Sequence, residues 1–118
     1  MFNFEKLEVW QQAIEFAGLV YTLTRAFPEN ERFGLTNQMR RAAVSISSNI
    51  AEGSSRASRG DFARFVEIAT GSVFEVVSQA TISRRQRFFS EADFARLYAA
   101  AEKQSRMLSG LRKALLKS

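Results

Sequence analysis

The chain has 118 residues, 46% of them hydrophobic, which is enough to build one compact core. It contains no cysteine and no histidine, which excludes disulfides, zinc–thiolate sites, thiol chemistry and the usual general base near neutral pH. The net charge of +5 and the pI near 10.2 favour anionic partners. We therefore expect one non-enzymatic domain, residues 1–118, with no metal, cofactor or small-molecule substrate.

One proline and six glycines leave few breaks, so the composition favours helices. The first predicted helix covers about residues 4–26. One apolar row, with steps of three and four residues, contains Leu7, Trp10, Ile14, Ala17, Tyr21 and Thr24. A second apolar row on a neighbouring face contains Val9, Phe16, Val20, Leu23 and Phe27. A helix with two apolar faces needs two neighbouring helices to bury them. We therefore expect one face of this helix to contact another subunit.

Pro28 ends the first helix, and the second is predicted over residues 31–52, stopped by Gly53-Ser54-Ser55. Its core row is Leu35, Met39, Ala42, Ile46 and Ile50. Small residues between these positions, such as Ala43 and Ser47, indicate that another helix approaches closely.

Two capping patterns place the remaining helices. Ser58 with Asp61 predicts a third helix from residue 58 to about 87, and Ser90 with Asp93 predicts a fourth that continues to the end. The short connections predict an all-α, antiparallel up-down-up-down four-helix bundle that assembles as a homo-oligomer.

A polar row lies beside the apolar row of the second helix and contains Gln38, Arg41, Ser45, Asn49 and Glu52. In one interpretation this face binds a ligand or a nucleic-acid phosphate through Arg40 and Arg41. In the favoured interpretation the row is structural, and Arg41, Asn49 and Glu52 form hydrogen bonds between helices, because polar groups inside a bundle must be paired.

Carboxylates on the third helix raise a different hypothesis, a metal-dependent hydrolase that uses Glu52, Glu67 or Glu75. Helical metal sites of the ferritin kind pair glutamates with histidines, which this chain lacks. An ion pair between Glu67 and Arg64 is the favoured interpretation, and Gly71 on the same stripe is expected to allow close helix packing.

A basic cluster formed by Arg84, Arg85 and Arg87 precedes Phe88 and Phe89. Arginine suits bidentate phosphate contacts, and the chain has thirteen arginines against four lysines. The cluster is either a solvated charge run or a contact to nucleic acid, and the two phenylalanines either stack on unpaired bases or close the end of the bundle.

Several motifs run along nearly the whole chain: Leu7-x-x-Trp10, Phe27-Pro28, Glu31-x-x-Gly34-Leu35, the run from Gln38 through Arg40-Arg41-Ala42-Ala43 to Ala51-Glu52-Gly53, and Phe65-x-x-Ile68-Ala69-x-Gly71-Ser72. Together they resemble the four-helix-bundle family of 23S rRNA-intervening sequence proteins. The chain is also similar to the accessory variability determinant of diversity-generating retroelements. The resemblance implies a homopentameric ring with a positive surface that binds nucleic acid or a nucleic-acid enzyme such as a reverse transcriptase.

The predicted function is therefore a non-enzymatic oligomeric bundle that binds RNA or DNA through Arg40, Arg41, Arg84, Arg85 and Arg87. The alternative is a scaffold whose positive surface meets an acidic protein. The start of the sequence lacks the pattern of a signal peptide, and no stretch is apolar for the roughly 18 residues of a membrane span. We expect a cytoplasmic protein without membrane contact.

Overall fold

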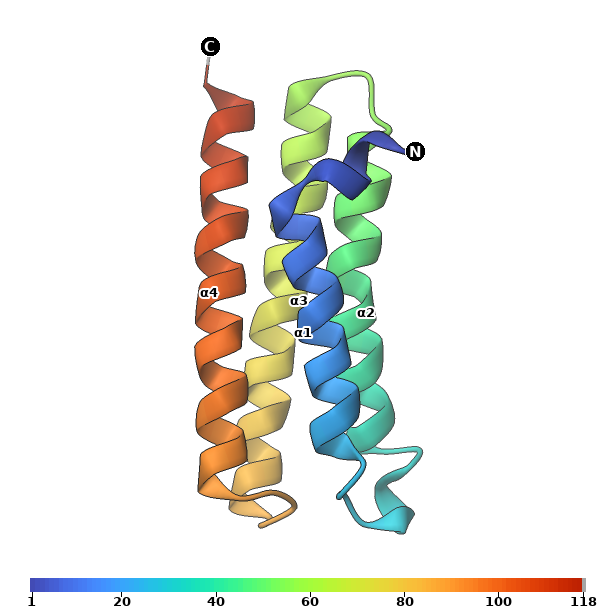
Figure 1. Cartoon of the computed structure of the whole chain (residues 1–118), viewed down its shortest axis with the longest axis vertical. Helices are drawn as coiled ribbons and strands as arrows, with labels where there is room; N and C mark the ends of the chain where they lie inside the picture. Colours follow the sequence, from blue (N-terminus) through green and yellow to red (C-terminus); the bar gives the residue numbers. More distant parts are fainter. Residues whose placement is uncertain (118) are drawn as a thin grey trace.

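The computed structural model describes residues 1–117, which form four α-helices, two short 3-10 helices and no strand. The elements are η1 (Asn3–Lys6), α1 (Glu8–Thr24), η2 (Glu29–Glu31), α2 (Leu35–Ser54), α3 (Arg59–Arg85) and α4 (Glu91–Leu116). They pack side by side into a four-helix rod of 46 × 22 × 20 Å (Figure 1). The prediction of an all-α fold is confirmed.

The helices surround a common core, with α2 packed most extensively on α3, α3 on α4, and α1 against both α2 and α4. The core row predicted for α2 is buried except for Leu35, which is half-buried. The buried Gln104 on α4 is satisfied because its side-chain amide donates to the Val9 carbonyl on α1 at 3.1 Å. Polar contacts inside the core therefore connect helices that are distant in sequence.

The first helix begins later than predicted, because Leu7 has an extended backbone (φ −77°, ψ 123°) that separates η1 from α1. Phe4 in η1 folds back on Trp10, with ring centroids 5.0 Å apart. Phe4 and Trp10 are both half-buried. The single predicted helix over residues 4–26 is thus two elements joined at Leu7.

The predicted free face of α1 is mostly covered within the chain. The row of Val9, Phe16, Val20 and Leu23 forms the core, and Leu7, Trp10 and Ala17 of the other row pack half-buried against it. Only Ile14 (46%) and Tyr21 (40%) remain exposed. Little apolar surface of α1 is therefore left to bind a second subunit, and the oligomer itself stays a prediction.

The second helix starts at Leu35 rather than at residue 31. The Glu31 carboxylate accepts a hydrogen bond from the Leu35 amide at 3.1 Å, which satisfies one of the unpaired donors at the helix start. Residues 32–34 consequently form a turn, and Phe33 projects from it. At the other end α2 continues through Gly53 to Ser54, so the helix ends within the predicted stop of residues 53–55 but two residues later than residue 52.

Both predicted serine caps are present. The hydroxyl of Ser58 accepts from the Asp61 amide at 3.0 Å, and that of Ser90 accepts from the Asp93 amide at 3.1 Å. These bonds set the starts of α3 and α4 within one residue of their predicted positions. The Asp61 carboxylate pairs with Arg64 at 2.9 Å.

The turn between α3 and α4 is held by the backbone of Arg87, which has the left-handed φ of 61°. Its amide donates to Arg84 O, and the Phe88 amide donates to Ser83 O, both at 2.9 Å. This is the Schellman arrangement that ends many helices, with arginine where glycine is usual. The turn directs Phe88 and the next residue back into the bundle.

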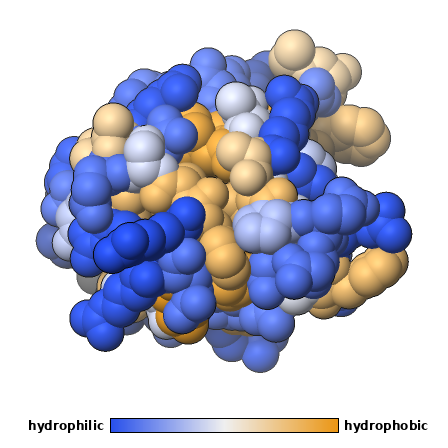
Figure 2. Space-filling view, turned by 90° about the horizontal axis from the view of Figure 1, so that it is seen from below, coloured by the Kyte–Doolittle hydropathy of each residue, from blue (hydrophilic) through white to orange (hydrophobic). Residues whose placement is uncertain are grey.

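Aromatic rings close this end of the bundle. The ring of Phe27 lies 5.6 Å from Phe88 and 5.4 Å from Phe89, and Phe89 lies 6.1 Å from Phe94. Figure 2, which views the same end, shows hydrophobic surface near the centre inside a ring of hydrophilic side chains. The α1–α2 and α3–α4 turns lie at this end, and η1 and the last turn of α4 lie at the opposite one (Figure 1).

Candidate nucleic-acid interface

A groove runs over the exposed side of α2 and the turn before it, with a volume of about 640 Å³. We call it the α2 groove. It is lined by Tyr21, Arg32, Phe33, Thr36, Asn37, Arg40, Arg41, Val44, Ser45 and Ser48. Three of these residues are arginines, and no acidic residue of the described chain is among them. The groove therefore presents a positive surface to solvent.

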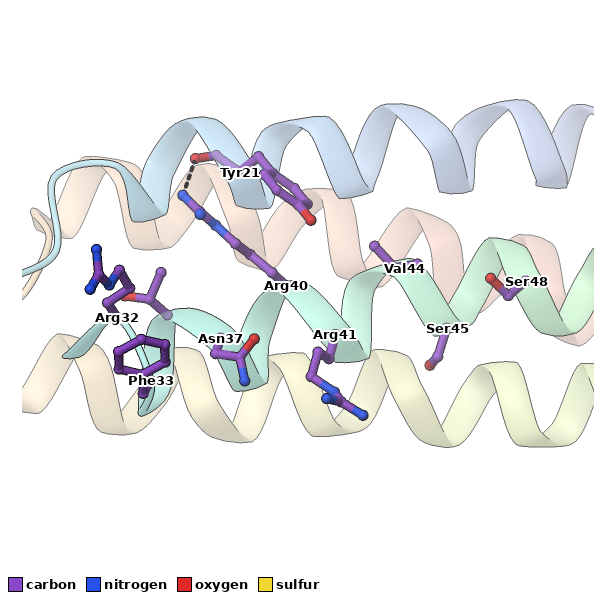
Figure 3. A pocket seen from close by; sticks show the side chains of 10 residues that line it. Tyr21, Arg32, Phe33, Asn37, Arg40, Arg41, Val44, Ser45 and Ser48 are labelled. Carbon is purple, nitrogen blue, oxygen red and sulfur yellow. Dashed lines mark hydrogen bonds between the residues drawn. The ribbon is translucent and has the colours of Figure 1, made fainter.

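Arg40 is fixed by contacts to α1. Its Nε donates to the hydroxyl of Thr24 at 2.9 Å and its Nη2 to the Tyr21 carbonyl at 3.4 Å. The guanidinium carbon lies 4.6 Å from the centroid of the Tyr21 ring, which is a cation–π contact. Figure 3 shows this side chain reaching from α2 to Tyr21. Two of its five donors are used, so Arg40 is pre-oriented with donors left for an anion.

Arg41 points away from Arg40, toward α3 (Figure 3). The side chain is exposed, and no hydrogen bond or ion pair to it occurs within residues 1–117. Of the two predicted arginines on α2, this one is therefore the less committed to the fold. The expectation that Arg41 forms hydrogen bonds between helices is wrong for the single chain.

The rest of the polar row is also bonded differently from the prediction. Asn49 donates to Ser45 O in its own helix at 2.8 Å, and Glu52 pairs with Arg56 at 3.5 Å. Only the Ser45 hydroxyl forms a hydrogen bond to another helix, where it meets the hydroxyl of Ser72 on α3. The row does not act as a set of interhelical bonds, because its long side chains lie at the bundle surface.

The basic cluster at the α3–α4 turn divides into two kinds of residue. Arg84 is half-buried, 4.0 Å from the Phe94 ring centroid and 3.8 Å from the Glu91 carboxylate. Arg85 and Arg87 are exposed. Because Phe88 packs on Phe27, the interpretation in which the phenylalanines close the bundle holds. The cluster shares one end of the rod with the start of the α2 groove but does not line it.

The glutamates of the hydrolase hypothesis do not gather at one place. Glu67 pairs with Arg112 on α4 at 2.7 Å, and not with Arg64 as predicted. No group of three or more acidic side chains able to hold a metal ion occurs in the described part of the chain. Gly71 is exposed, and a Cβ atom there would meet nothing within 4 Å, so it does not serve close packing inside the chain.

Arg32, Phe33 and Tyr21 also line the groove and are not among the site residues predicted from the sequence. Arg32 and Phe33 were placed inside the second helix, where one exposed aromatic is unremarkable. The structure places Phe33 in the turn with 82% of its surface exposed, and the Arg32 guanidinium lies 4.8 Å from its ring. The sequence does contain a sign of this exposure, because Phe33 is not part of the apolar row of the second helix and precedes Gly34.

The family model of the 23S rRNA-intervening sequence protein matches residues 5–110. The chain belongs to this family. A comparison with curated proteins gives no match.

A crystal structure of a protein of unknown function from the S23 ribosomal protein family of Bacteroides thetaiotaomicron is similar to this member of the intervening sequence family. The TM-score is 0.82 at 23% identity, over 89% of this chain and 98% of the other. This likeness supports the fold. None of the described helices is both long enough and apolar enough to cross a membrane.

Proposed function

We propose that this intervening sequence protein is a non-enzymatic, oligomeric, antiparallel bundle that binds RNA or DNA through the α2 groove. The observation that carries the proposal is the set of three arginines around a groove without an acidic lining residue. Arg40 supports it because its contacts to α1 hold the guanidinium in place before an anion arrives. Guanidinium groups bind phosphate oxygens through paired donors.

The sequence preference should be small. Arginine contacts to phosphates position a protein on nucleic acid but carry no sequence information. The exposed Arg85 and Arg87 lie at the same end of the rod and would extend the positive surface along a strand. In an oligomer each groove is repeated, so weak contacts add through avidity.

Fluorescence anisotropy with labelled RNA and DNA, over a range of salt concentrations, tests the proposal. Affinity should fall steeply with salt, because each neutralised phosphate contributes about −0.7 to the log–log slope for single strands. The double variant Arg32→Gln, Arg41→Gln should flatten that slope by about 1.4. Circular dichroism should show unchanged helix content, since both side chains are exposed.

The double variant Arg64→Gln, Arg112→Gln is the matched control. It also removes two positive charges. Arg64 and Arg112 lie outside the α2 groove, where they form exposed ion pairs with Asp61 and Glu67. If both double variants flatten the slope equally, overall charge binds the ligand and the groove has no special role. If wild-type protein fails to bind even at about 50 mM salt, where this electrostatic term is strong, the acidic-protein scaffold replaces this proposal, with a reverse transcriptase among the partners to test.

The assembly into a homo-oligomer is supported by a second groove, between α3 and α4. It has a volume of about 500 Å³, and its lining includes Phe74 and Tyr98, which are 64% and 43% exposed. Val73, Val77 and Ala101 add further apolar side chains to this lining. Apolar side chains clustered on a surface favour burial against another protein. Five copies are expected from the family resemblance.

Light scattering after size exclusion measures the assembly, because one chain has a mass of 13.3 kDa. Phe74→Ser should shift the protein toward the monomer, whereas Phe33→Ser removes an equally large exposed ring outside the α3–α4 groove and should not. A wild-type monomer at micromolar concentration would contradict the oligomer. Dissociation by both variants, or by neither, would contradict this interface.

A further inference from the structure

The α2 groove contains two exposed aromatic rings as well as arginines. Phe33 is 82% exposed and Tyr21 is 40% exposed, whereas Phe27, Phe89 and Phe94 are buried in the aromatic cluster nearby. Leaving a phenylalanine ring in water forgoes the favourable free energy that its burial would provide. The contacts within the described chain do not account for this exposure, so the ring is available to a partner.

Each exposed ring is paired with an arginine. The Arg32 guanidinium carbon lies 4.8 Å from the Phe33 ring centroid, and that of Arg40 lies 4.6 Å from the Tyr21 centroid. The two pairs come from different places, one within the α1–α2 turn and the other between α1 and α2 (Figure 3). The groove thus offers an aromatic surface and a phosphate-binding group together at two points.

We infer that the ligand of the α2 groove is single-stranded nucleic acid, with an unpaired base stacked on Phe33 and its phosphates at the groove arginines. This inference rests on the nucleic-acid binding proposed above and specifies which class is bound. A nucleotide combines a flat ring with an anionic group at short range, which matches the Phe33 and Arg32 pair. In a duplex the base faces are already stacked on one another, so the Phe33 ring has no free face to cover.

The size of the groove agrees with this ligand. Its volume of about 640 Å³ falls in the usual range of about 300 to 1,000 Å³ for small-molecule sites, which is enough for a short piece of a strand. An acidic peptide would use the three arginines equally well and would leave the Phe33 ring without a stacking partner. The exposed ring therefore favours a strand of bases over an acidic protein.

The test compares three labelled ligands by anisotropy at fixed salt: a short single strand, a duplex of the same length, and a strand of that length with abasic positions. The abasic strand keeps the phosphates and lacks the rings. Wild-type protein should bind the intact single strand most tightly. Phe33→Ala should weaken that binding by about 5-fold to 150-fold, the range for one stacked base, and should change the abasic and duplex affinities by less than about 2-fold, since neither offers a free base.

Phe33→Tyr is the matched control, because it keeps a ring and should keep the preference for the single strand. If wild-type protein binds all three ligands equally and Phe33→Ala has no effect, the stacking inference is wrong, while the salt-dependent binding of the proposed function stands. If Phe33→Ala weakens all three ligands alike, Phe33 supports the groove in general, and the inference is again wrong. If a polyglutamate of equal charge competes as well as the single strand, the ligand is an acidic protein. Failure of the wild type to bind any nucleic acid would remove the proposed function as well.

Discussion

Gly53→Ala should destabilise the protein, although alanine is the better helix former. A Cβ atom built on Gly53 would lie 2.7 Å from Phe65 Cβ and 2.8 Å from Phe62 Cδ1, both on α3. Both distances are far shorter than ordinary carbon contacts, and Phe65 Cβ cannot move without its backbone. Overpacking of this kind costs about 1 to 3 kcal/mol, and the gain in helix propensity offsets about 0.5 to 1 kcal/mol of it. At the middle of both ranges the net loss is about 1 kcal/mol.

Thermal unfolding followed by circular dichroism at one fixed protein concentration measures this loss. A chain of this size should lose about 2 to 10 °C in Tm. Gly18→Ala is the matched control, since Gly18 lies inside α1 and a Cβ there would meet nothing within 4 Å. It should raise Tm by a few degrees, because glycine inside a helix costs about 0.5 to 1 kcal/mol. If both variants raise Tm by the same amount, α2 and α3 do not approach each other closely at Gly53, and the prediction is wrong.

Three further predictions concern single side chains. Ser58→Ala should lower the free energy of unfolding by about 0.5 to 2 kcal/mol, because it removes the acceptor for the Asp61 amide; urea unfolding measures it, and no change would contradict the cap. Arg87→Gly should raise the free energy of unfolding by about 1 kcal/mol, because the φ of 61° at this position strains any residue except glycine. A lower urea midpoint for the variant would show that the Arg87 side chain stabilises the fold by more than this backbone strain costs. Arg112→Gln should change the free energy of unfolding by less than about 1 kcal/mol, since the pair with Glu67 is exposed, and a larger loss would disqualify Arg112 as a control for binding.

The sequence is informative where structure depends on neighbours along the chain. The caps at Ser58 and Ser90 were predictable because a serine three residues before an acid satisfies amides of the same turn. The buried row of α2 was predictable because apolar residues spaced by three and four positions fall on one side of a helix, and that side faces the core. The break in the helix at Leu7 was not predictable, since it depends on Phe4 packing back on Trp10.

Contacts between helices explain what could not be predicted about the site. Arg40 and Arg41 are adjacent in sequence, but one is fixed by Thr24 and Tyr21 while the other is exposed. Spacing cannot show which neighbour each arginine meets. The same holds for Gly53, which resembles a helix stop in sequence and serves a close contact with α3.

The separation of the two ends of the rod determines how the protein can be fused to a tag or fixed to a surface. A peptide fused before η1 or after α4 leaves from the end opposite the α1–α2 and α3–α4 turns (Figure 1). The long dimension of 46 Å then lies between the fusion and the turn that carries Arg32. Copies immobilised through either fusion would therefore all direct their arginine-bearing turns away from the support, and an attached label would stay clear of any strand bound there.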